Sequence, residues 1–107
     1  MSLQANSLKI GGILTDGFHK LAEKHNLIGD VRGLGLMLGV ELVKDRSTKE
    51  PAKEECAEVF ERCKDLGLLI GKGGLFGNTL RIKPPMCINE SDAAFMLEVI
   101  DEAMSGV

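Results

Sequence analysis

The sequence lacks several features that would mark a membrane, secreted or nucleic-acid-binding protein. No apolar run approaches the roughly 20 residues that a transmembrane helix needs. Residues 1–12 show neither the basic start and apolar stretch of a signal peptide nor an arginine-rich targeting segment. Basic charge is not in excess, because the net charge is −3. We therefore expect neither a membrane nor a nucleic acid as a partner.

Cysteine is scarce, and its spacing excludes a C-x-x-C motif. The three cysteines are Cys56, Cys63 and Cys87. If Cys56 and Cys63 share a helix, their Cα atoms lie about 10 Å apart, beyond the reach of a disulfide. We expect all three to be reduced and mostly buried, with no metal site. His19 and His25 are six residues apart and do not share a helical face, so we expect solvated or capping roles for them.

What the sequence does contain is typical of one soluble globular domain. The chain has 107 residues, of which 44% are hydrophobic and 27% charged. No internal repeat, low-complexity tract or linker interrupts it, so residues 1–107 are expected to form a single domain. A domain of this length can bury a real, although thin, core.

Hydrophobic periodicity predicts helices alternating with short strands. The expected order is helix 6–25, extended segment 27–33, strand 36–43, helix 51–66, strand 68–70, loop 71–78, strand 79–85 and a helix that begins after Asn89. Strands joined by a short glycine-rich loop should pair antiparallel. The predicted fold class is therefore α+β: a two-layer domain with an antiparallel or mixed sheet and helices packed on one face.

Several expectations concern particular side chains. In the strand 36–43, alternation places Leu36, Leu38, Val40 and Leu42 on one face and Val43 on the other. In the second helix, Pro51 suits the first turn and Gly67 the end. The apolar stripe of this helix is expected to be Cys56, Val59, Phe60, Cys63 and Leu66. Asn89 followed by Asp92 predicts the start of the last helix.

Two glycine clusters suggest phosphate binding at first sight, but neither fits. Gly33, Gly35 and Gly39 have the spacing G-x-G-x-x-x-G and lead into a strand, whereas a dinucleotide fingerprint opens a helix. The stretch GKGGLFGNT also fails the P-loop pattern. We interpret Gly33 and Gly35 as aids to a tight turn, and Gly39 as a place where another part of the chain approaches closely.

Few residues are candidates for chemistry. No Ser/His/Asp arrangement is present, and Lys72 and Lys83 lie near loops and strand ends, where solvated lysines are the rule. Arg81 is different, because it alternates with Leu80 and Ile82 on a strand. A guanidinium held on a rigid strand beside a glycine-rich loop can grip a carboxylate through two parallel hydrogen bonds. The spacing alone favours an ordinary surface arginine and leaves carboxylate binding as the alternative.

The stretch IGDVRGLGLMLGVELV, followed later by NTLRIKPPMCI, resembles the C-terminal small domain of class III (fold type I) pyridoxal-phosphate aminotransferases. Within this family the sequence resembles the alanine–glyoxylate aminotransferase 2 group most. The motifs GDVRGxGLMxGxELV and LRIxPPM are specific to the family in this order, and the resemblance covers about residues 26–104. The opening matches less well, and residues 1–5 are a candidate for an added, non-native extension.

The resemblance implies a role for Arg81. In the family, the small domain is an antiparallel sheet flanked by helices, and the arginine of the R-x-x-P-P motif, here Arg81, binds the α-carboxylate of the substrate. The implied reaction transfers an amino group from L-alanine to glyoxylate on pyridoxal phosphate, in a dimeric and mitochondrial enzyme. The cofactor-binding lysine, aspartate and phosphate loops belong to the family's large domain. The resemblance therefore assigns this chain no catalytic, cofactor-binding or metal-binding residue.

We accordingly expect a small-domain fragment of an aminotransferase that is inactive alone and binds no pyridoxal phosphate by itself. Two alternatives stay open: a stand-alone module that binds a carboxylate metabolite through Arg81, and a purely structural interaction module. A domain cut from a larger partner exposes apolar surface, so we also expect the chain to form homo-oligomers.

Overall fold

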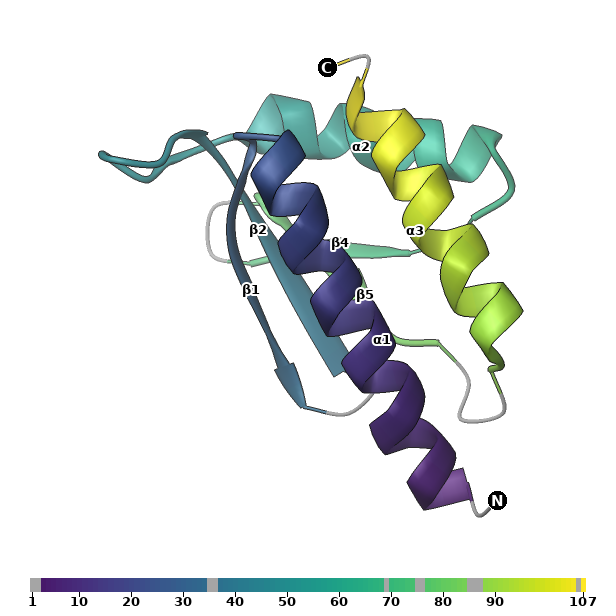
Figure 1. Ribbon diagram of the computed structural model, residues 1–107. Coiled ribbons are helices and arrows are strands. Elements are labelled where there is room, and N and C mark those ends of the chain that lie inside the picture. The colour runs from purple at the N-terminus through teal and green to yellow at the C-terminus, as the bar shows by residue number, and fades with distance from the viewer. Residues whose placement is uncertain (1–2, 35–36, 69, 75–76, 85–87, 106) are drawn as a thin grey trace.

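The computed structural model describes residues 3–34, 37–68, 70–74, 77–84, 88–105 and 107 (Figure 1). The helices of this described part are α1 (Leu3–Lys24), α2 (Lys53–Asp65) and α3 (Glu90–Ser105). Its strands are β1 (Ile28–Leu34), β2 (Met37–Asp45), β3 (Glu50–Pro51), β4 (Gly71–Gly73) and β5 (Thr79–Ile82). None of the helices in these described segments is long and apolar enough to cross a bilayer.

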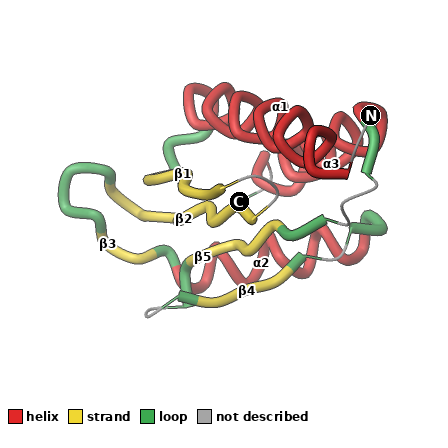
Figure 2. Tube along the Cα trace, turned by 90° about the horizontal axis from the view of Figure 1, so that it is seen from below, coloured by secondary structure: helices red, strands yellow, loops and turns green. Residues whose placement is uncertain are grey.

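The strands form one antiparallel sheet. Its order is β1-β2-β5-β4, and the short β3 pairs with the end of β2. Figure 2 shows β4 at one edge of the sheet and α1 and α3 lying together on one side of the strands. The antiparallel α+β fold expected from the sequence is confirmed.

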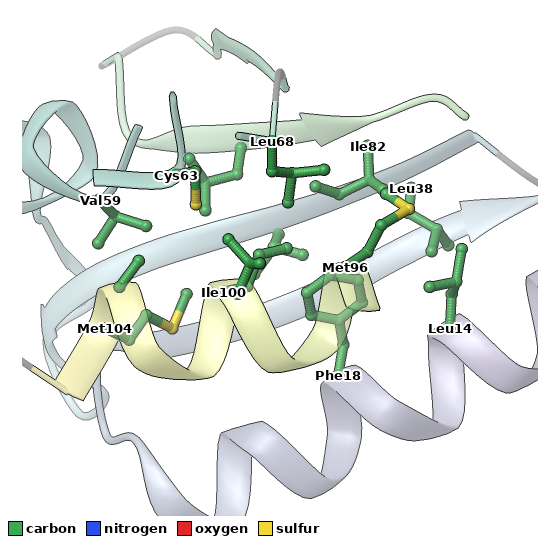
Figure 3. Close-up of a cluster of buried hydrophobic side chains, with 14 of the residues drawn as sticks. Leu14, Phe18, Leu38, Val59, Cys63, Leu68, Ile82, Met96, Ile100 and Met104 are labelled. Atoms are coloured by element: carbon green, nitrogen blue, oxygen red, sulfur yellow. The ribbon is translucent and has the colours of Figure 1, made fainter. Parts of the chain in front are cut away.

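The core lies between the sheet and the helices. Alternate residues of β2 and β5 are buried: Leu38, Val40 and Leu42 on β2, and Leu80 and Ile82 on β5. These side chains join one cluster with buried residues of all three helices, which therefore cover the same face of the sheet. Figure 3 shows members of this cluster, including Leu14, Phe18, Val59, Cys63, Met96, Ile100 and Met104.

Local signals set several element ends as expected. The Asp92 N–H donates to Asn89 Oδ1 at 2.8 Å and the Asn89 N–H to Asp92 Oδ2 at 3.3 Å, a reciprocal cap at the start of α3. Gly67 follows the end of α2 with a φ of +90°, a backbone conformation that glycine adopts at low cost. The Gly67 N–H donates to the carbonyl of Lys64, which satisfies one of the last helical carbonyls.

Tertiary pairing overrides other local expectations. Pro51 does not open α2; it lies in β3 opposite Val43, and the helix begins at Lys53. Val43 is buried but is not part of the core cluster, in agreement with the face that alternation predicts: its side chain packs against Gly29 near an irregularity in the pairing. Leu66 lies just beyond α2 and is 41% exposed, so it does not belong to the buried stripe.

The predicted strand 68–70 is wrong. Leu68 and Ile70 are outside any strand, and β4 begins at Gly71 inside the segment expected to be a loop. The position of β4 is set by its pairing with β5, in which Gly71 lies opposite Arg81 and Gly73 lies opposite Thr79. Other residues for which the sequence makes predictions lie outside the described segments: Gly35, Leu36, Leu69, Pro85 and Cys87.

Candidate substrate-binding site

The face of the sheet opposite the helices is open, and Arg81 lies on it. Leu80 and Ile82 point into the core, so the intervening Arg81 side chain is directed to the other face, where it is exposed. In the register of the sheet, Arg81 has Gly39 of β2 on one side and Gly71 of β4 on the other. Both neighbours are glycines, so neither adjacent strand places a side chain directly beside Arg81 on this face.

The Arg81 side chain lies over β4. A Cβ atom added at Gly73 would come within 2.7 Å of both Cζ and Nε of Arg81, and within 2.8 Å of Nη2. A Cβ added at Gly71 would lie 3.1 Å from the Arg81 Cβ. The side chain therefore leaves the backbone beside Gly71 and brings its guanidinium against Gly73, two residues along the edge strand.

Among the four arginines, Arg81 differs in its partners. Arg32 pairs with Asp30 and Glu41, Arg62 pairs with Glu58, and Arg46 donates to backbone carbonyls. The Arg81 guanidinium makes no hydrogen bond or ion pair with another residue in the described segments. Its donors are therefore available for a planar anionic group such as a carboxylate.

A second positive charge on the open face is already neutralised. Arg32 lies opposite Gly39, so Gly39 separates it from Arg81 in the sheet. Its Nε contacts Asp30 Oδ2 at 2.8 Å and its Nη2 contacts Glu41 Oε2 at 3.3 Å. The open face therefore presents one unpaired and one paired guanidinium among its described residues.

The glycine clusters do not form phosphate loops. Gly33 and Gly39 lie in β1 and β2, and the segment that begins at Gly71 leads into β5 rather than into a helix. A Cβ at Gly33 would lie 2.3 Å from the Met37 carbonyl oxygen, which explains a glycine in this hairpin. A Cβ at Gly39 would come no closer than 3.6 Å to another atom, so the close approach expected there occurs at Gly73 instead.

The lysines of this chain do not fit a pyridoxal phosphate site. A lysine that binds the cofactor covalently needs a desolvating pocket to become nucleophilic. All nine lysines fall within the described segments, and each is exposed. Lys72 lies with Nζ 5.3 Å from the centre of the Phe60 ring on α2, and Lys83 follows β5. Neither has the buried setting that covalent catalysis requires.

The cysteines and histidines have structural surroundings. Cys56 and Cys63 are free and buried in the core, and burial raises the pKa of each thiol to about 11. His25 Nε2 lies 2.7 Å from Asp101 Oδ1, which links the ends of α1 and α3, and His19 is exposed. Within the described residues, no group of three metal-binding side chains comes together.

Two residues near the site were missed by sequence reasoning. The Arg81 guanidinium lies against Gly73. The Gly-Lys-Gly pattern at residues 71–73, shortly before the strand that contains Arg81, could have indicated a place where a side chain lies flat on backbone. Asn78 is buried, and its Nδ2 donates to the Leu42 carbonyl at 2.8 Å. The Leu42 N–H donates in turn to the Asn78 carbonyl at 2.8 Å, so Asn78 attaches the start of β5 to β2.

Comparison with known proteins places this arrangement in a family. Residues 1–104 match the family described as aminotransferase class-III. The mitochondrial alanine–glyoxylate aminotransferase 2 homolog 2 of Arabidopsis thaliana is 52% identical over 103 residues, which are 96% of this chain and 22% of the relative.

Solved structures show the same fold. A Bacillus anthracis aminotransferase superposes with a TM-score of 0.92 at 35% identity, covering 98% of this chain and 24% of its own. An amine transaminase from an uncultivated Pseudomonas species, solved in its PLP-bound form, has a TM-score of 0.87 at 26% identity, covering 97% and 23%. The chain thus spans about a fifth of the length of the curated relative. The chain belongs to the class III aminotransferases.

Proposed function

We propose that this chain is the small domain of a pyridoxal-phosphate-dependent aminotransferase and that Arg81 binds the α-carboxylate of its substrates. In the whole enzyme the amino group passes from L-alanine to glyoxylate. Residues 1–107 form one domain in this proposal, and the enzyme is mitochondrial and homo-oligomeric. The family membership and the similarity to the Arabidopsis relative support the reaction class.

One observation carries the role of Arg81. Its guanidinium is exposed on the open face, at the edge of the sheet, and has no acidic partner among the described residues. Arginine presents parallel N–H donors that match the two oxygens of a carboxylate. Both L-alanine and glyoxylate carry a carboxylate next to the reacting carbon, so one arginine can hold either.

The contribution of this chain is to bind and orient. A substrate held by its carboxylate loses most of its rotational freedom, and its reacting carbon is then directed toward the other walls of the site. Pyridoxal phosphate supplies the electron sink when it is bound in the whole enzyme. No lysine of this chain meets the requirement for attaching it, so the cofactor belongs to another part of the enzyme in this proposal.

The test is Arg81→Ala in the full-length aminotransferase that carries this sequence. Loss of a charge-assisted bidentate contact is expected to lower kcat/KM for L-alanine by roughly ten- to a hundredfold. Arg81→Lys, which keeps the charge but not the planar fork, should recover only part of this loss. The half-reaction with ethylamine, which has no carboxylate, should not change when it is followed as a single turnover in the absence of glyoxylate. An equal loss for both substrates would contradict carboxylate binding.

The isolated chain provides a second test. We expect no amino transfer from alanine and no saturable change in the absorbance of added pyridoxal phosphate. Saturable cofactor binding that maps to a single lysine would overturn the proposed division of roles. Tight binding of a carboxylate by the isolated chain, lost in Arg81→Ala, would favour a stand-alone binding module. The structural interaction module predicts no carboxylate binding at all.

A further inference from the structure

We infer that Gly73 is a positioning residue: the bare backbone of β4 holds the Arg81 guanidinium flat against the sheet, where it can receive a carboxylate. The inference rests on the proposed role of Arg81 and extends it to a residue that contacts no substrate. A Cβ at Gly73 would overlap Cζ and Nε of Arg81 at 2.7 Å, so the guanidinium occupies the space that a side chain at this position would need.

The side chains of β4 leave the space over Gly73 free for the Arg81 guanidinium. Side chains alternate along β4, so Gly71 and Gly73 share the open face with Arg81, and Lys72 is directed toward the helices. Lys72 places its ammonium group 5.3 Å from the centre of the Phe60 ring of α2, which ties this edge strand to the helical layer. Because Lys72 is held on the helical side, Gly71 and Gly73 lie on the same face as Arg81.

This contact restricts an otherwise flexible side chain. An arginine that projects freely from a strand samples many rotamers and loses that freedom when it binds a ligand. Here the side chain rests on backbone from Gly71 to Gly73, so part of the ordering is already present before the substrate arrives. A methyl group at position 73 would lift the guanidinium from the sheet and misdirect its paired donors.

The fold should tolerate the substitution. The overlapping atoms are the far end of a flexible side chain, which can move away, and Gly73 is not among the glycines with positive φ. Gly39 offers a matched control on the other side of Arg81, because its added Cβ would make only an ordinary 3.6 Å contact with Thr79 Cγ2. Both positions lie on the open face within strands that pair with β5.

The experiment compares Gly73→Ala with Gly39→Ala in the full-length aminotransferase. Because a misplacement of about 1 Å can cost up to a hundredfold in rate, Gly73→Ala is expected to lower kcat/KM for L-alanine by roughly ten- to a hundredfold. The half-reaction with ethylamine, followed as a single turnover without glyoxylate, and the thermal unfolding midpoint should stay unchanged, and Gly39→Ala should alter none of the three. Binding of propionate, a carboxylate without an amine, provides a readout independent of turnover and should weaken by a similar factor.

A double-mutant cycle separates this inference from the proposed function. If Gly73 acts through Arg81, Gly73→Ala should cause no further loss in an Arg81→Ala background. If Arg81→Ala lowers L-alanine turnover but Gly73→Ala does not, the positioning role is wrong and carboxylate binding stands. If Arg81→Ala itself has no selective effect, the proposed function fails. An additive loss in the double variant would show that Gly73 acts by another route, and would overturn the inference.

Discussion

At the scale of single residues, burial controls the thiols of the core. Cys56 and Cys63 lie on the inner stripe of α2, and burial raises the pKa of each from its ordinary value of 9.0 to about 11. At Cys56 the positive charge of Lys72 opposes this rise in part. The thiolate is the reactive form, so these side chains behave as small apolar groups near neutral pH.

Because Cys56 and Cys63 are buried and protonated, we expect both thiols to react slowly with a disulfide reagent. In a Cys87→Ser variant, the native chain at pH 8 should react far more slowly with 5,5′-dithiobis(2-nitrobenzoate) than the chain unfolded in guanidinium chloride. Absorbance of the released thiol measures both rates. Rapid reaction of either thiol in the native chain would contradict burial of a protonated sulfur.

The same pKa shifts predict a loss of stability in alkali. The unfolded thiols ionise near pH 9, whereas the folded ones resist ionisation until about pH 11. Their contribution to stability is therefore complete below pH 9 and is lost as the pH rises toward 11. Urea unfolding midpoints measured from pH 8 to pH 11 should fall over this window. A Cys56→Ala variant should show a smaller fall, and an unchanged slope would argue against the shift.

Asp101 gives a residue-scale prediction in acid. Hydrogen bonds from His25, and then from Lys24, hold the pKa of this carboxyl below its ordinary value of 3.8. The contribution to stability is present above that value and is lost as the pH falls through the lowered pKa. Because the groups are partly exposed, Asp101→Asn should cost only about 0.2–1 kcal/mol at pH 6. The difference from the parent chain should shrink below pH 3.8, as urea unfolding can measure.

At the scale of elements, side chains attach neighbouring segments through backbone groups. Arg46, in the turn between β2 and β3, donates from Nε to the Ile28 carbonyl at 3.1 Å and from Nη2 to the His25 carbonyl at 3.0 Å. It also donates to the carbonyl of Ala22 in the last turn of α1. A single guanidinium thus satisfies carbonyls where the helix ends and β1 begins.

Asn78 allows a test of how such contacts hold two strands together. Its side chain and main chain both bond to Leu42, which places β5, and therefore Arg81, beside β2. Asn78→Ala removes a buried donor and leaves the Leu42 carbonyl short of one partner, so we expect a loss of about 1–3 kcal/mol in the free energy of unfolding. Asn26→Ala, at an exposed position, is the control and should stay within about 0.5 kcal/mol. Equal effects of the two would refute the attachment.

At the scale of the whole molecule, apolar side chains remain on the surface. Leu8 is 66% exposed on α1, Met37 is 62% exposed on β2, and Phe95 is 48% exposed on α3. The open face of the sheet, which carries Met37 and Arg81, has no covering layer among the described residues. A chain that matches about a fifth of its relatives is expected to present surface that other parts of such an enzyme would cover.

We therefore predict that the isolated chain self-associates as its concentration rises. Sedimentation velocity over a concentration series should show an increasing weight-average mass. The triple variant Leu8→Gln, Met37→Gln and Phe95→Gln should shift this rise to higher concentration, because it removes exposed apolar surface. A monomer at every concentration would contradict the prediction.

Features that depend on short-range interactions could be predicted from the amino-acid sequence. Helical spacing buries Ile10, Leu14 and Phe18 on one side of α1, and the reciprocal cap of Asn89 and Asp92 starts α3 where it was predicted. These features depend on residues three or four positions apart. The motif containing Arg81 likewise carried enough information to name a family and a candidate ligand-binding residue.

Features that depend on partners far apart in the chain could not be predicted in this way, because strand pairing sets them. The edge strand β4 lies at Gly71–Gly73 rather than at 68–70, because its backbone pairs with β5 and not because of its own side chains. Pro51 joins β3 for the same reason. The contact between the Arg81 guanidinium and Gly73 requires the register of two strands, and no local propensity encodes that register. A sequence pattern selects the face on which a side chain lies, whereas the pairing of strands decides what lies beside it.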